Sequence, residues 1–410
     1  MKLPHRVLVI GLARSGQAAA LALARRGVLV VAADRDPTRT NGRLADAGVE
    51  VHAGNEEDRL LDDVELVVKS PGVPGDAPLP AAARARGIPI WSEVELGYRL
   101  LSKHRFVGVT GTNGKTTTCE LLGAMFRAER VPVAVAGNVG RPLTSFDGAL
   151  PPEAWIVCEL SSFQLEDVHE LACEIAVLLN LEPDHLDRHR TFEAYREAKL
   201  RIFERARAKI VPRGSGLEGT EFAADDPLPA EPLIRGAHNR ANAAAATVAA
   251  RRAGLGDDAI AEALRTFPGV EHRLELVAEL DGVRYVNDSK ATNASAARRG
   301  IAAYAGEPLH LILGGSLKGE SFDELASFLP VTVRTIDLIG EATDELAASL
   351  DRAGRSYRRS GDLATALARA ASDATRGSVV LLSPACASFD QFRDFEDRGE
   401  TFRRLVAQLR

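Results

Sequence analysis

Residues 106–118 read FVGVTGTNGKTTT, an apolar strand pattern followed by a loop with two glycines and the start of a helix. Gly111 and Gly114 let the loop turn its backbone N–H groups inward around phosphate oxygens, and the helix start adds its positive dipole end. Lys115 is placed to reach the terminal phosphates, and the hydroxyl of Thr116 is placed to meet Mg²⁺. We therefore predict a nucleotide-binding loop. Because Val109 stands where the general pattern has its first glycine, the alternative is a glycine-rich turn with an incidental lysine.

The chain around this loop has the length and composition of a soluble globular protein with several domains. Its 410 residues, 45% hydrophobic and 26% charged, leave room for two to four domains, of which we expect three. A net charge of −6 provides no basic footprint for nucleic acid. The apolar runs are shorter than the roughly 20 residues that span a bilayer, and the start does not read as a signal peptide. The four cysteines lack CxxC spacing, which favours a reducing cytoplasm.

Apolar runs rich in β-formers alternate with helical patterns along nearly the whole sequence, which predicts α/β layers with mostly parallel sheets. We predict a Rossmann-like domain over residues 1–93, a central P-loop domain over 94–269, and a Rossmann-like α/β domain over 270–410. Asp281-Gly282 between two strand patterns predicts a β-hairpin that opens the third domain. The segment 211–235, rich in Gly, Pro and Glu, is the least regular part, and we predict a last helix near residues 399–409.

Polar residues follow the next two strand patterns of the central domain. Glu159 ends AWIVCE, where a carboxylate beside the phosphate loop would hold Mg²⁺ directly or through water. By itself it reads equally well as a solvated strand-end carboxylate. The following strand ends in NLEPDHLDRH, which brings Asp184, His185, Asp187 and His189 to the same sheet edge. Ligands of α/β proteins collect at such edges, so we predict a role in metal or substrate binding, with a structural histidine as the alternative.

The amino-terminal turn GLARSG, residues 11–16, follows a strand and opens a helix, and Asp34 ends the next strand. This pattern is close to a dinucleotide fingerprint, but Ala13 replaces the glycine that normally lets the backbone approach a pyrophosphate. A nucleotide diphosphate at the helix start, with Ser70 to Gly72 as the neighbouring loop, fits better than NAD. An unused Rossmann-like scaffold is the remaining alternative.

A set of motifs in fixed order resembles the Mur ligase family over nearly the whole length of the chain. They are TGTNGKTTT, GNVG, CELSSFQLE, NLEPDHLDRH, YREAKLRIFE, GAHNRANAAAA, EHRLE, NDSKATN and LSPACASFDQFRDFEDRG. NDSKATN and LSPACASFDQF are most similar to the D-glutamate-adding branch, whereas branches that add other amino acids share the phosphate loop and differ in the third domain. Folylpolyglutamate synthases share the central domain and lack a uridine-binding first domain.

The resemblance implies an ATP-dependent amide ligase of peptidoglycan precursor synthesis, which serves cell-wall growth and division. It would join D-glutamate to UDP-N-acetylmuramoyl-L-alanine through an acyl phosphate and release ADP and phosphate. The implied partners are these small molecules and not nucleic acid, the expected state is a monomer, and two Mg²⁺ ions are expected.

The resemblance also implies a role for individual residues of this sequence. The residues implied in ATP binding are Gly111, Thr112, Asn113, Gly114, Lys115, Thr116, Thr117, Asn239, Asn242, Arg273 and Asp288. Those implied for the uridine nucleotide substrate are Leu12, Arg14, Ser15, Asp34, Arg35, Ser70, Gly72, Asn138, Ser161, Gln164 and His185. Those implied for D-glutamate are Lys290, Thr292, Lys318, Ser388, Phe389 and Phe395. Lys115, Glu159, His185 and Lys199 would serve catalysis.

For the metal ions, the resemblance assigns Thr116 and Glu159 to one Mg²⁺ and His185 and Lys199 to the second. A lysine ammonium has no lone pair and cannot ligate a cation. The family resolves this by carbamylation, which would turn Lys199 into an oxygen ligand. By itself, Lys199 reads as a helix-surface lysine that makes i,i+4 pairs.

Three other functions are compatible with parts of the sequence. A nucleotide-dependent oxidoreductase would use the amino-terminal turn and leave TGTNGKTTT unexplained. A P-loop switch or assembly module would hydrolyse ATP without regard to D-glutamate. A Mur-type ligase for a different amino acid would share the phosphate loop and differ in the third-domain motifs.

Overall fold

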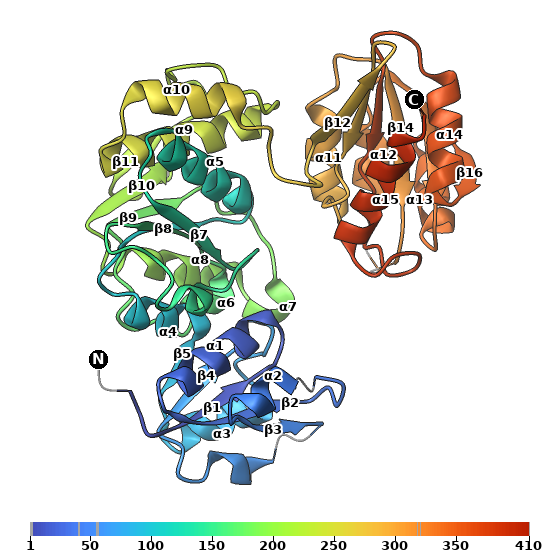
Figure 1. Ribbon diagram of the computed structural model, residues 1–410. Helices are drawn as coiled ribbons and strands as arrows, with labels where there is room; N and C mark the ends of the chain where they lie inside the picture. Colours follow the sequence, from blue (N-terminus) through green and yellow to red (C-terminus); the bar gives the residue numbers. More distant parts are fainter. Residues whose placement is uncertain (1–2, 40–41, 55–56, 318, 320, 410) are drawn as a thin grey trace. The chain divides into compact units, whose positions relative to one another are not determined.

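The computed structural model describes the chain except for residues 1–2, 40–41, 55–56, 318, 320 and 410. Within the described residues, three β-sheets follow one another along the sequence, each flanked by helices (Figure 1). The predicted mixed α/β class with mostly parallel sheets is therefore confirmed. No helix in this described part is both long and apolar enough to cross a membrane.

The first sheet is entirely parallel, in the order β3-β2-β1-β4-β5. Its strands are β1 (Arg6–Ile10), β2 (Leu29–Asp34), β3 (Glu50–Ala53), β4 (Leu66–Lys69) and β5 (Ile90–Ser92). The helices of this region are α1 (Arg14–Arg25), α2 (Gly42–Asp46), α3 (Pro78–Ala85) and α4 (Glu93–Leu100), with a 3₁₀ turn at Asp58–Leu61. Apolar side chains on both faces of the sheet are buried, which explains why its central strands β1, β2 and β4 read mostly as apolar runs.

The second sheet is also parallel, in the order β11-β10-β9-β6-β8-β7. Its strands are β6 (Arg105–Thr110), β7 (Val133–Gly137), β8 (Trp155–Glu159), β9 (Ile175–Leu178), β10 (Ala208–Pro212) and β11 (Thr220–Phe222). Its helices are α5 (Lys115–Ala128), α6 (Ser162–Leu165), α7 (Leu186–His189), α8 (Phe192–Leu200), α9 (Ala237–Ala253) and α10 (Asp257–Thr266), with 3₁₀ turns at Leu143–Phe146 and Arg201–Phe203. Strand β6 lies between β8 and β9, so the loops after all three strands share one edge.

The third sheet has the order β12-β13-β17-β14-β15-β16. Its strands are β12 (Glu275–Leu280), β13 (Val283–Asn287), β14 (Leu309–Gly314), β15 (Val333–Ile339), β16 (Arg358–Gly361) and β17 (Val379–Leu382). Its helices are α11 (Ala294–Ala302), α12 (Asp323–Phe328), α13 (Thr343–Arg352), α14 (Leu363–Asp373) and α15 (Phe395–Ala407). The predicted hairpin is confirmed, because β12 and β13 pair antiparallel across Asp281 and Gly282, which have φ angles of 51° and 78°.

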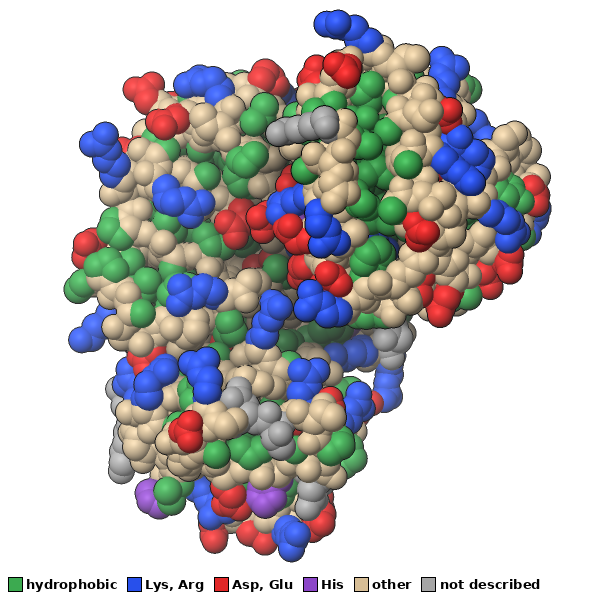
Figure 2. Space-filling model, turned by 45° about the vertical axis from the view of Figure 1, so that its right-hand side comes forward, with side chains coloured by type: hydrophobic (Ala, Val, Ile, Leu, Met, Phe, Trp, Pro, Cys, Tyr) green, Lys and Arg blue, Asp and Glu red, His purple; other side chains and the backbone are tan. Residues whose placement is uncertain are grey.

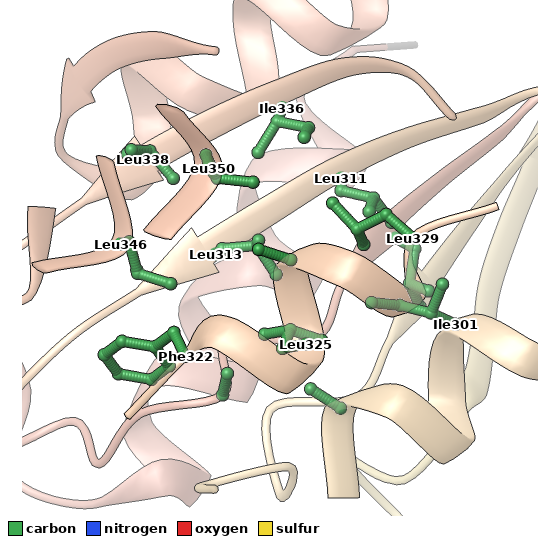
Figure 3. Close-up of a cluster of buried hydrophobic side chains, with 14 of the residues drawn as sticks. Ile301, Leu311, Leu313, Phe322, Leu325, Leu329, Ile336, Leu338, Leu346 and Leu350 are labelled. Carbon is green, nitrogen blue, oxygen red and sulfur yellow. The ribbon is translucent and has the colours of Figure 1, made fainter. Parts of the chain in front are cut away.

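One face of the third sheet is covered by α11, α12 and α13. Ile301 of α11 packs with leucines of α12, α13, β14 and β15 in one apolar cluster (Figure 3). The opposite face packs against α14 and α15 through a second cluster that includes Leu367 and Phe402. This two-sided burial explains why β14, which reads LHLILG, is apolar except for His310.

Two compact units emerge from the packing: Met1–Glu231 with Ala241–Arg265, and Pro232–Arg240 with Thr266–Arg410. The first and second sheets thus belong to one unit, and the third sheet belongs to the other. The predicted boundaries near residues 93 and 270 stay predictions. On the face drawn in Figure 2, Lys and Arg side chains are interspersed with Asp and Glu side chains.

Two segments differ from the sequence-based expectation. The irregular stretch 211–235 begins within β10 and contains the short strand β11, which extends the second sheet. The last helix begins at Phe395 rather than near residue 399. Asp394 causes the earlier start, because its carboxylate accepts a hydrogen bond from the N–H of Asp397 at 2.7 Å and caps the helix.

Candidate functional site

The predicted phosphate loop connects β6 to α5. Gly111 and Gly114 adopt φ angles of 152° and 84°, which L side chains rarely adopt. A Cβ atom on Gly114 would lie 2.2 Å from Oδ1 of Asn242, so the loop backbone rests directly on α9. The ammonium of Lys115 donates to the carbonyl oxygens of Gly111 and Thr112 at 2.9 and 3.0 Å. The loop thus has the glycine-dependent geometry of a phosphate cradle.

Asn180, which the sequence analysis did not single out, holds this loop from the end of β9. Its side-chain oxygen accepts from the N–H of Asn113 at 2.9 Å, and its amide donates back to the Asn113 carbonyl at 3.1 Å. Its own carbonyl accepts from the N–H of Thr112 at 3.1 Å. The position of the phosphate loop is therefore fixed by a strand that lies far away in the sequence.

Lys199 on α8 is brought to the same loop. Its ammonium is buried and donates to the Gly111 carbonyl at 2.8 Å. Burial, together with the positive charge of Lys115, lowers the pKa of Lys199 to about 7. The interpretation of Lys199 as a helix-surface lysine is therefore wrong.

Tyr195, one turn earlier on α8, is a further residue that the sequence analysis missed. Its hydroxyl hydrogen-bonds to that of Thr112 at 2.9 Å, and burial raises its pKa to about 12. The Lys199 ammonium lies 4.7 Å from the centre of the Tyr195 ring. One face of α8 is thus directed at the phosphate loop.

Glu159 ends β8, next to the strand that leads into the phosphate loop. Its side chain is 3% exposed, and one carboxylate oxygen accepts from the Asn138 amide at 3.1 Å. The interpretation of Glu159 as a solvated strand end is therefore wrong. Thr116 is half-buried in the first turn of α5. Within the described residues, no three His, Cys, Asp or Glu side chains come together as a metal-binding group.

Ser161 and Gln164 form a capping box at the start of α6. The N–H and hydroxyl of Ser161 both donate to the side-chain oxygen of Gln164 at 3.0 Å, and the Gln164 N–H donates to the Ser161 hydroxyl at 3.2 Å. The buried side-chain nitrogen of Gln164 has no hydrogen-bond partner among the described residues.

His185 and His189 have different environments although both lie at α7. His185 adopts a left-handed backbone conformation with φ 53°, and half of its side chain is exposed. His189 is buried, hydrogen-bonds to the Ser162 hydroxyl at 2.8 Å and stacks on Phe163 at 5.1 Å between ring centroids. His189 therefore has a packing role, whereas His185 is accessible to a ligand. The side chain of Asp187 lies outside the described residues.

A cavity of about 580 Å³ lies at the amino-terminal glycine turn. It brings together five of the residues implied for the uridine nucleotide, namely Ser15, Asp34, Arg35, Ser70 and Gly72. Gly16 is required here, because a Cβ atom would lie 1.8 Å from the carbonyl oxygen of Gly11. Ala13 lines the cavity and is exposed, so its methyl group is accommodated.

Two other residues implied for this pocket are placed differently. The Leu12 side chain belongs to the apolar core, and its backbone N–H donates to Asp34 at 2.6 Å. Leu12 therefore shapes the turn through its backbone. Arg14 is exposed at the start of α1 and is not among the residues that line the cavity.

Asn239 and Asn242, two of the residues implied in ATP binding, lie on α9. Asn239 is buried and donates to the carbonyl of Arg235 at 2.7 Å. Asn242 is also buried, with its amide against Gly114. Asn242 belongs to the same compact unit as the phosphate loop, whereas Asn239 belongs to the other unit.

In the second unit, Asp288 is buried at the end of β13. It accepts from the Ser383 hydroxyl at 2.7 Å and from the N–H of Leu274 at 3.3 Å. Burial raises its pKa to about 7, and the charge of Arg273 opposes that shift. Asp288 thus lies directly after β13 and close enough to Arg273 to feel its charge.

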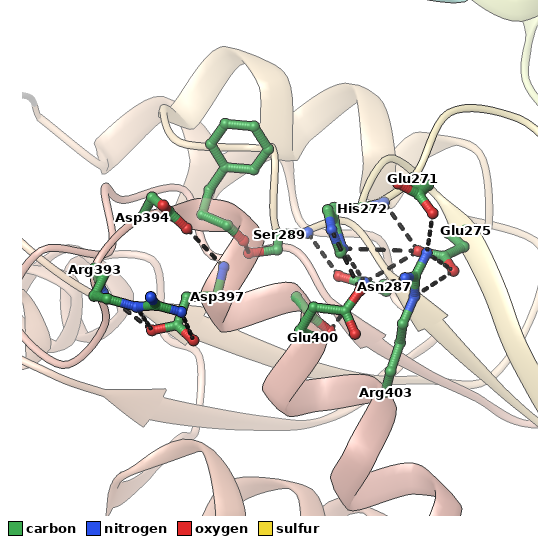
Figure 4. A network of polar contacts seen from close by, with 12 residues as sticks. Glu271, His272, Glu275, Asn287, Ser289, Arg393, Asp394, Asp397, Glu400 and Arg403 are labelled. Carbon is green, nitrogen blue, oxygen red and sulfur yellow. Dashed lines mark hydrogen bonds and ion pairs between the residues drawn. The ribbon is translucent and has the colours of Figure 1, made fainter. Parts of the chain in front are cut away.

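The residues implied for D-glutamate are distributed over neighbouring loops of the same unit. Lys290 lies 5.7 Å from the ring centre of Phe395, the first residue of α15. Ser388 is buried, Phe389 is 73% exposed, and Thr292 is half-buried. Lys318 lies outside the described residues. Figure 4 shows the adjoining polar network, in which Asn287 hydrogen-bonds to His272 at 3.0 Å.

Arg398 on α15 ties these loops together, and the sequence analysis did not identify it. Its fully buried guanidinium donates to acceptors in three loops: the Ser289 hydroxyl (2.9 Å) and carbonyl (2.8 Å), and the carbonyls of Gly314 (3.4 Å), Cys386 (3.1 Å) and Ala387 (3.1 Å). Burial lowers its pKa to about 10. Arg398 is therefore the common support of the loops that carry Lys290 and Ser388.

Comparisons with known proteins show the family of the chain. Family models match three consecutive parts of the chain: "Mur ligase MurD-like, N-terminal domain" over residues 5–92, "Mur ligase middle domain" over 109–215, and "Mur ligase, glutamate ligase domain" over 272–386. The chain therefore belongs to the Mur ligase family.

Relatives and solved structures extend the match over the full length. The chain is 39% identical to a UDP-N-acetylmuramoylalanine–D-glutamate ligase of Geobacillus kaustophilus, with 99% of this chain and 98% of that protein covered. It is 42% identical to the ligase of the same name from Sphingopyxis alaskensis, with the same coverage. A MurF ligase from Thermotoga maritima in complex with ADP shares the fold, with a TM-score of 0.62, 18% identity, and complete coverage of both chains.

Proposed function

We propose that this chain is an ATP-dependent ligase that joins D-glutamate to UDP-N-acetylmuramoyl-L-alanine in peptidoglycan precursor synthesis. Relatives with this activity in their names match it over nearly its whole length. The structural observation that carries the proposal is the meeting of a buried lysine of α8 with the phosphate loop at Gly111. A plain ATPase has no evident need for this second lysine.

Amide formation from a free carboxylate is unfavourable in water, so the carboxylate first needs a leaving group. ATP would supply it by phosphorylating the alanyl carboxylate, and the amine of D-glutamate would then displace phosphate from the acyl phosphate. The loop N–H groups and Lys115 would offset the charge of the phosphoryl group during transfer. The hydrogen bonds that Lys115 now makes to its own loop would be exchanged for phosphate oxygens.

The side chains near the phosphate loop include groups that can bind Mg²⁺. Glu159 is a buried carboxylate beside the phosphate loop, and Thr116 carries a hydroxyl in the first turn of α5. Mg²⁺ commonly binds through one or two carboxylates, substrate phosphates and water, so a cluster of protein carboxylates is not required. We propose Thr116 and Glu159 for one ion, and His185 with modified Lys199 for another. The ions would neutralise the anions that must approach each other.

Lys199 has the properties that carbamylation requires. Only a neutral amine attacks CO₂, and the lowered pKa makes the neutral form common near pH 7. The modification would convert a buried cation next to Lys115 into an anion, which replaces repulsion with attraction. We propose that the modified side chain is the functional form.

The amino acid would bind in the second unit. D-Glutamate carries two carboxylates, and Lys290 with Lys318 would provide two positive charges, while Ser388, Thr292, Phe389 and Phe395 would shape the pocket. Arg273, Asp288 and Asn239 would complete the contacts with ATP. The four free buried cysteines support a reducing, cytoplasmic setting, and we propose that the chain acts as a monomer.

Phosphate release from ATP, measured with the uridine-linked alanyl precursor and a panel of amino acids, tests the proposal. We expect release to require both the precursor and D-glutamate. Release that depends on another amino acid would assign the chain to a different branch of the family. Equal release without any amino acid would indicate a P-loop ATPase and contradict the proposal. Lys115→Ala should abolish turnover, and Lys318→Ala should mainly raise the KM for D-glutamate.

A further inference from the structure

The loop of residues 70–76, called the 70–76 loop below, contacts α7 through Arg188. The guanidinium of Arg188 donates to the carbonyl oxygens of Pro71 and Val73 at 3.0 and 3.2 Å. The loop belongs to the first sheet and lines the cavity at the glycine turn, whereas α7 follows β9 of the second sheet. One arginine thus connects the proposed nucleotide pocket to the segment that carries His185.

These contacts fix the direction of the Gly72 N–H group. The described peptide bonds are trans, and in a trans peptide the C=O and N–H groups point in opposite directions. When Arg188 holds the Pro71 carbonyl, the Gly72 N–H is directed away from α7. Gly72 lines the cavity together with Ser70 and Ser15, and a Cβ atom at Gly72 would meet open space. Arg188 therefore orients this N–H group through the peptide bond, without forming a hydrogen bond to it.

The base of the 70–76 loop is held independently of α7. Lys69 donates to the Val73 carbonyl at 3.2 Å and forms an ion pair with Asp167 at 3.1 Å, and both charged side chains are at least nine-tenths buried. Ser70 donates to the Gly11 carbonyl at 2.7 Å. Loss of Arg188 would leave these contacts in place, so the tip of the loop, rather than the fold, depends on it.

Arg188 and His185 share one support. The Arg188 guanidinium lies 3.9 Å from the centre of the Phe163 ring, and the His185 ring lies 5.0 Å from it. Phe163 belongs to α6, between Ser161 and Gln164. A change at the 70–76 loop therefore reaches His185 through a chain of two contacts, Arg188 and Phe163.

We propose that Arg188 is a positioning residue that orients the 70–76 loop toward the diphosphate of the nucleotide substrate and, through Phe163, sets the position of His185. This inference rests on the proposed function and specifies one of its parts. The positioning role requires a guanidinium group, because its planar fork can donate to two carbonyls while it stacks on an aromatic ring. A lysine ammonium supplies the charge without this geometry.

The variants Arg188→Ala and Arg188→Lys test the inference, with Arg190→Ala as the matched control. Arg190 lies two residues away and contacts the same loop through Asp76 at 3.1 Å, but both partners are more than 70% exposed. Exposed pairs of this kind contribute little. Binding of UDP and of UDP-N-acetylmuramoyl-L-alanine to the full chain is measured by calorimetry without ATP, followed by kcat and the KM of each substrate.

We expect Arg188→Ala to raise the Kd of both nucleotides about tenfold or more, and Arg188→Lys to raise it about threefold, whereas Arg190→Ala stays within about twofold. The KM for ATP should change less than the KM for the nucleotide substrate, and kcat should fall. General destabilisation would lower the active fraction without changing Kd. If the alanine variant does not fold, the lysine variant decides in the same way.

Three results contradict the inference. A Kd unchanged in Arg188→Lys and in any folded Arg188→Ala would show that Arg188 does not orient the loop. If the Arg188 variants bind UDP normally and only the Kd of UDP-N-acetylmuramoyl-L-alanine rises, Arg188 acts away from the diphosphate. Wild-type protein that binds neither nucleotide would contradict the proposed function itself and the inference with it, whereas the first two results leave the proposed function intact.

Discussion

The ammonium groups of Lys115 and Lys199 donate to the same carbonyl oxygen, that of Gly111, at 2.9 and 2.8 Å. Lys115 begins α5, and Lys199 lies near the end of α8, so the fold brings two distant lysines to one atom of the phosphate loop. Two ammonium groups that share one hydrogen-bond acceptor lie close together. Their repulsion favours the loss of a proton from one of them. Burial, together with the positive charge of Lys115, lowers the pKa of Lys199 to about 7, which favours its neutral form.

Replacement of Lys199 tests its proposed conversion into an anionic ligand. Lys199→Ala should lose turnover by about a hundredfold or more, because the ligand position on α8 becomes empty. Added acetate or formate should restore part of the turnover, since a small acid can occupy the space and supply oxygen ligands. The measurement is kcat against acid concentration. Lys209→Ala, on β10 of the second sheet, serves as the control, and equal effects of acid on both variants would contradict the assignment.

Replacement of Gly114 tests the close contact between the phosphate loop and α9. Gly114→Ala places a methyl group 2.2 Å from Asn242 and should weaken ATP binding at least about tenfold. Gly148→Ala is the matched control, because Gly148 also has a positive φ, 72°, but open space around it. It should lower stability by about 1 kcal/mol and leave ATP binding unchanged. ATP binding that is equal in the two variants would show that the contact has no role.

Asp288 should make the stability of the chain depend on pH. Its pKa is about 7 in the fold against an ordinary value of 3.8, so between these values the folded chain retains a proton that the unfolded chain has released. The stabilisation is complete below the lower value and is lost as the pH rises through the higher one.

The variant Asp288→Asn removes this titration. Above pH 7 it should be more stable than the wild type by about 2 to 4 kcal/mol, and the difference should vanish below about pH 4. The Ser383 hydroxyl can rotate to accept from the new amide. Thermal unfolding at several pH values measures the effect, with the exposed Asp344→Asn as control. A difference that does not vary with pH would contradict the burial-based account.

Arg398 should determine both the stability of the second unit and the use of D-glutamate. A lysine has too few donors for the five contacts of the guanidinium, so Arg398→Lys should cost about 2 to 4 kcal/mol and raise the KM for D-glutamate more than the KM for ATP. Arg393→Lys is the control, since Arg393 precedes the same helix and is 84% exposed. A KM for D-glutamate that stays unchanged would limit Arg398 to a purely structural role.

The phosphate loop was predictable because its determinants are local. A strand, a glycine loop and a helix start follow one another within residues 106–118, and the conformations of Gly111 and Gly114 are those that the pattern requires. The parallel sheets were predictable for the same reason, because strands buried on both faces read as apolar runs. The hairpin at Asp281-Gly282 depends on two adjacent residues and was also predicted.

The partners of the loop could not be derived in this way. Asn180, Tyr195 and Lys199 reach it by tertiary contacts whose sequence separation carries no local signal. Lys199 came from a family resemblance, and its own surroundings on α8 suggested a surface position. The short strand β11 escaped prediction because three residues carry too little periodicity. The start of α15 was missed although Asp394 provides a recognisable cap.

In the proposed reaction, a carboxylate oxygen of the uridine-linked substrate leaves with the phosphate. A precursor whose alanyl carboxylate is labelled with ¹⁸O, incubated with ATP and D-glutamate, measures this directly by mass spectrometry of the released phosphate. An acyl phosphate predicts one ¹⁸O atom in each phosphate formed together with the amide. Phosphate without the label would contradict an acyl phosphate, because its fourth oxygen would then not come from the alanyl carboxylate.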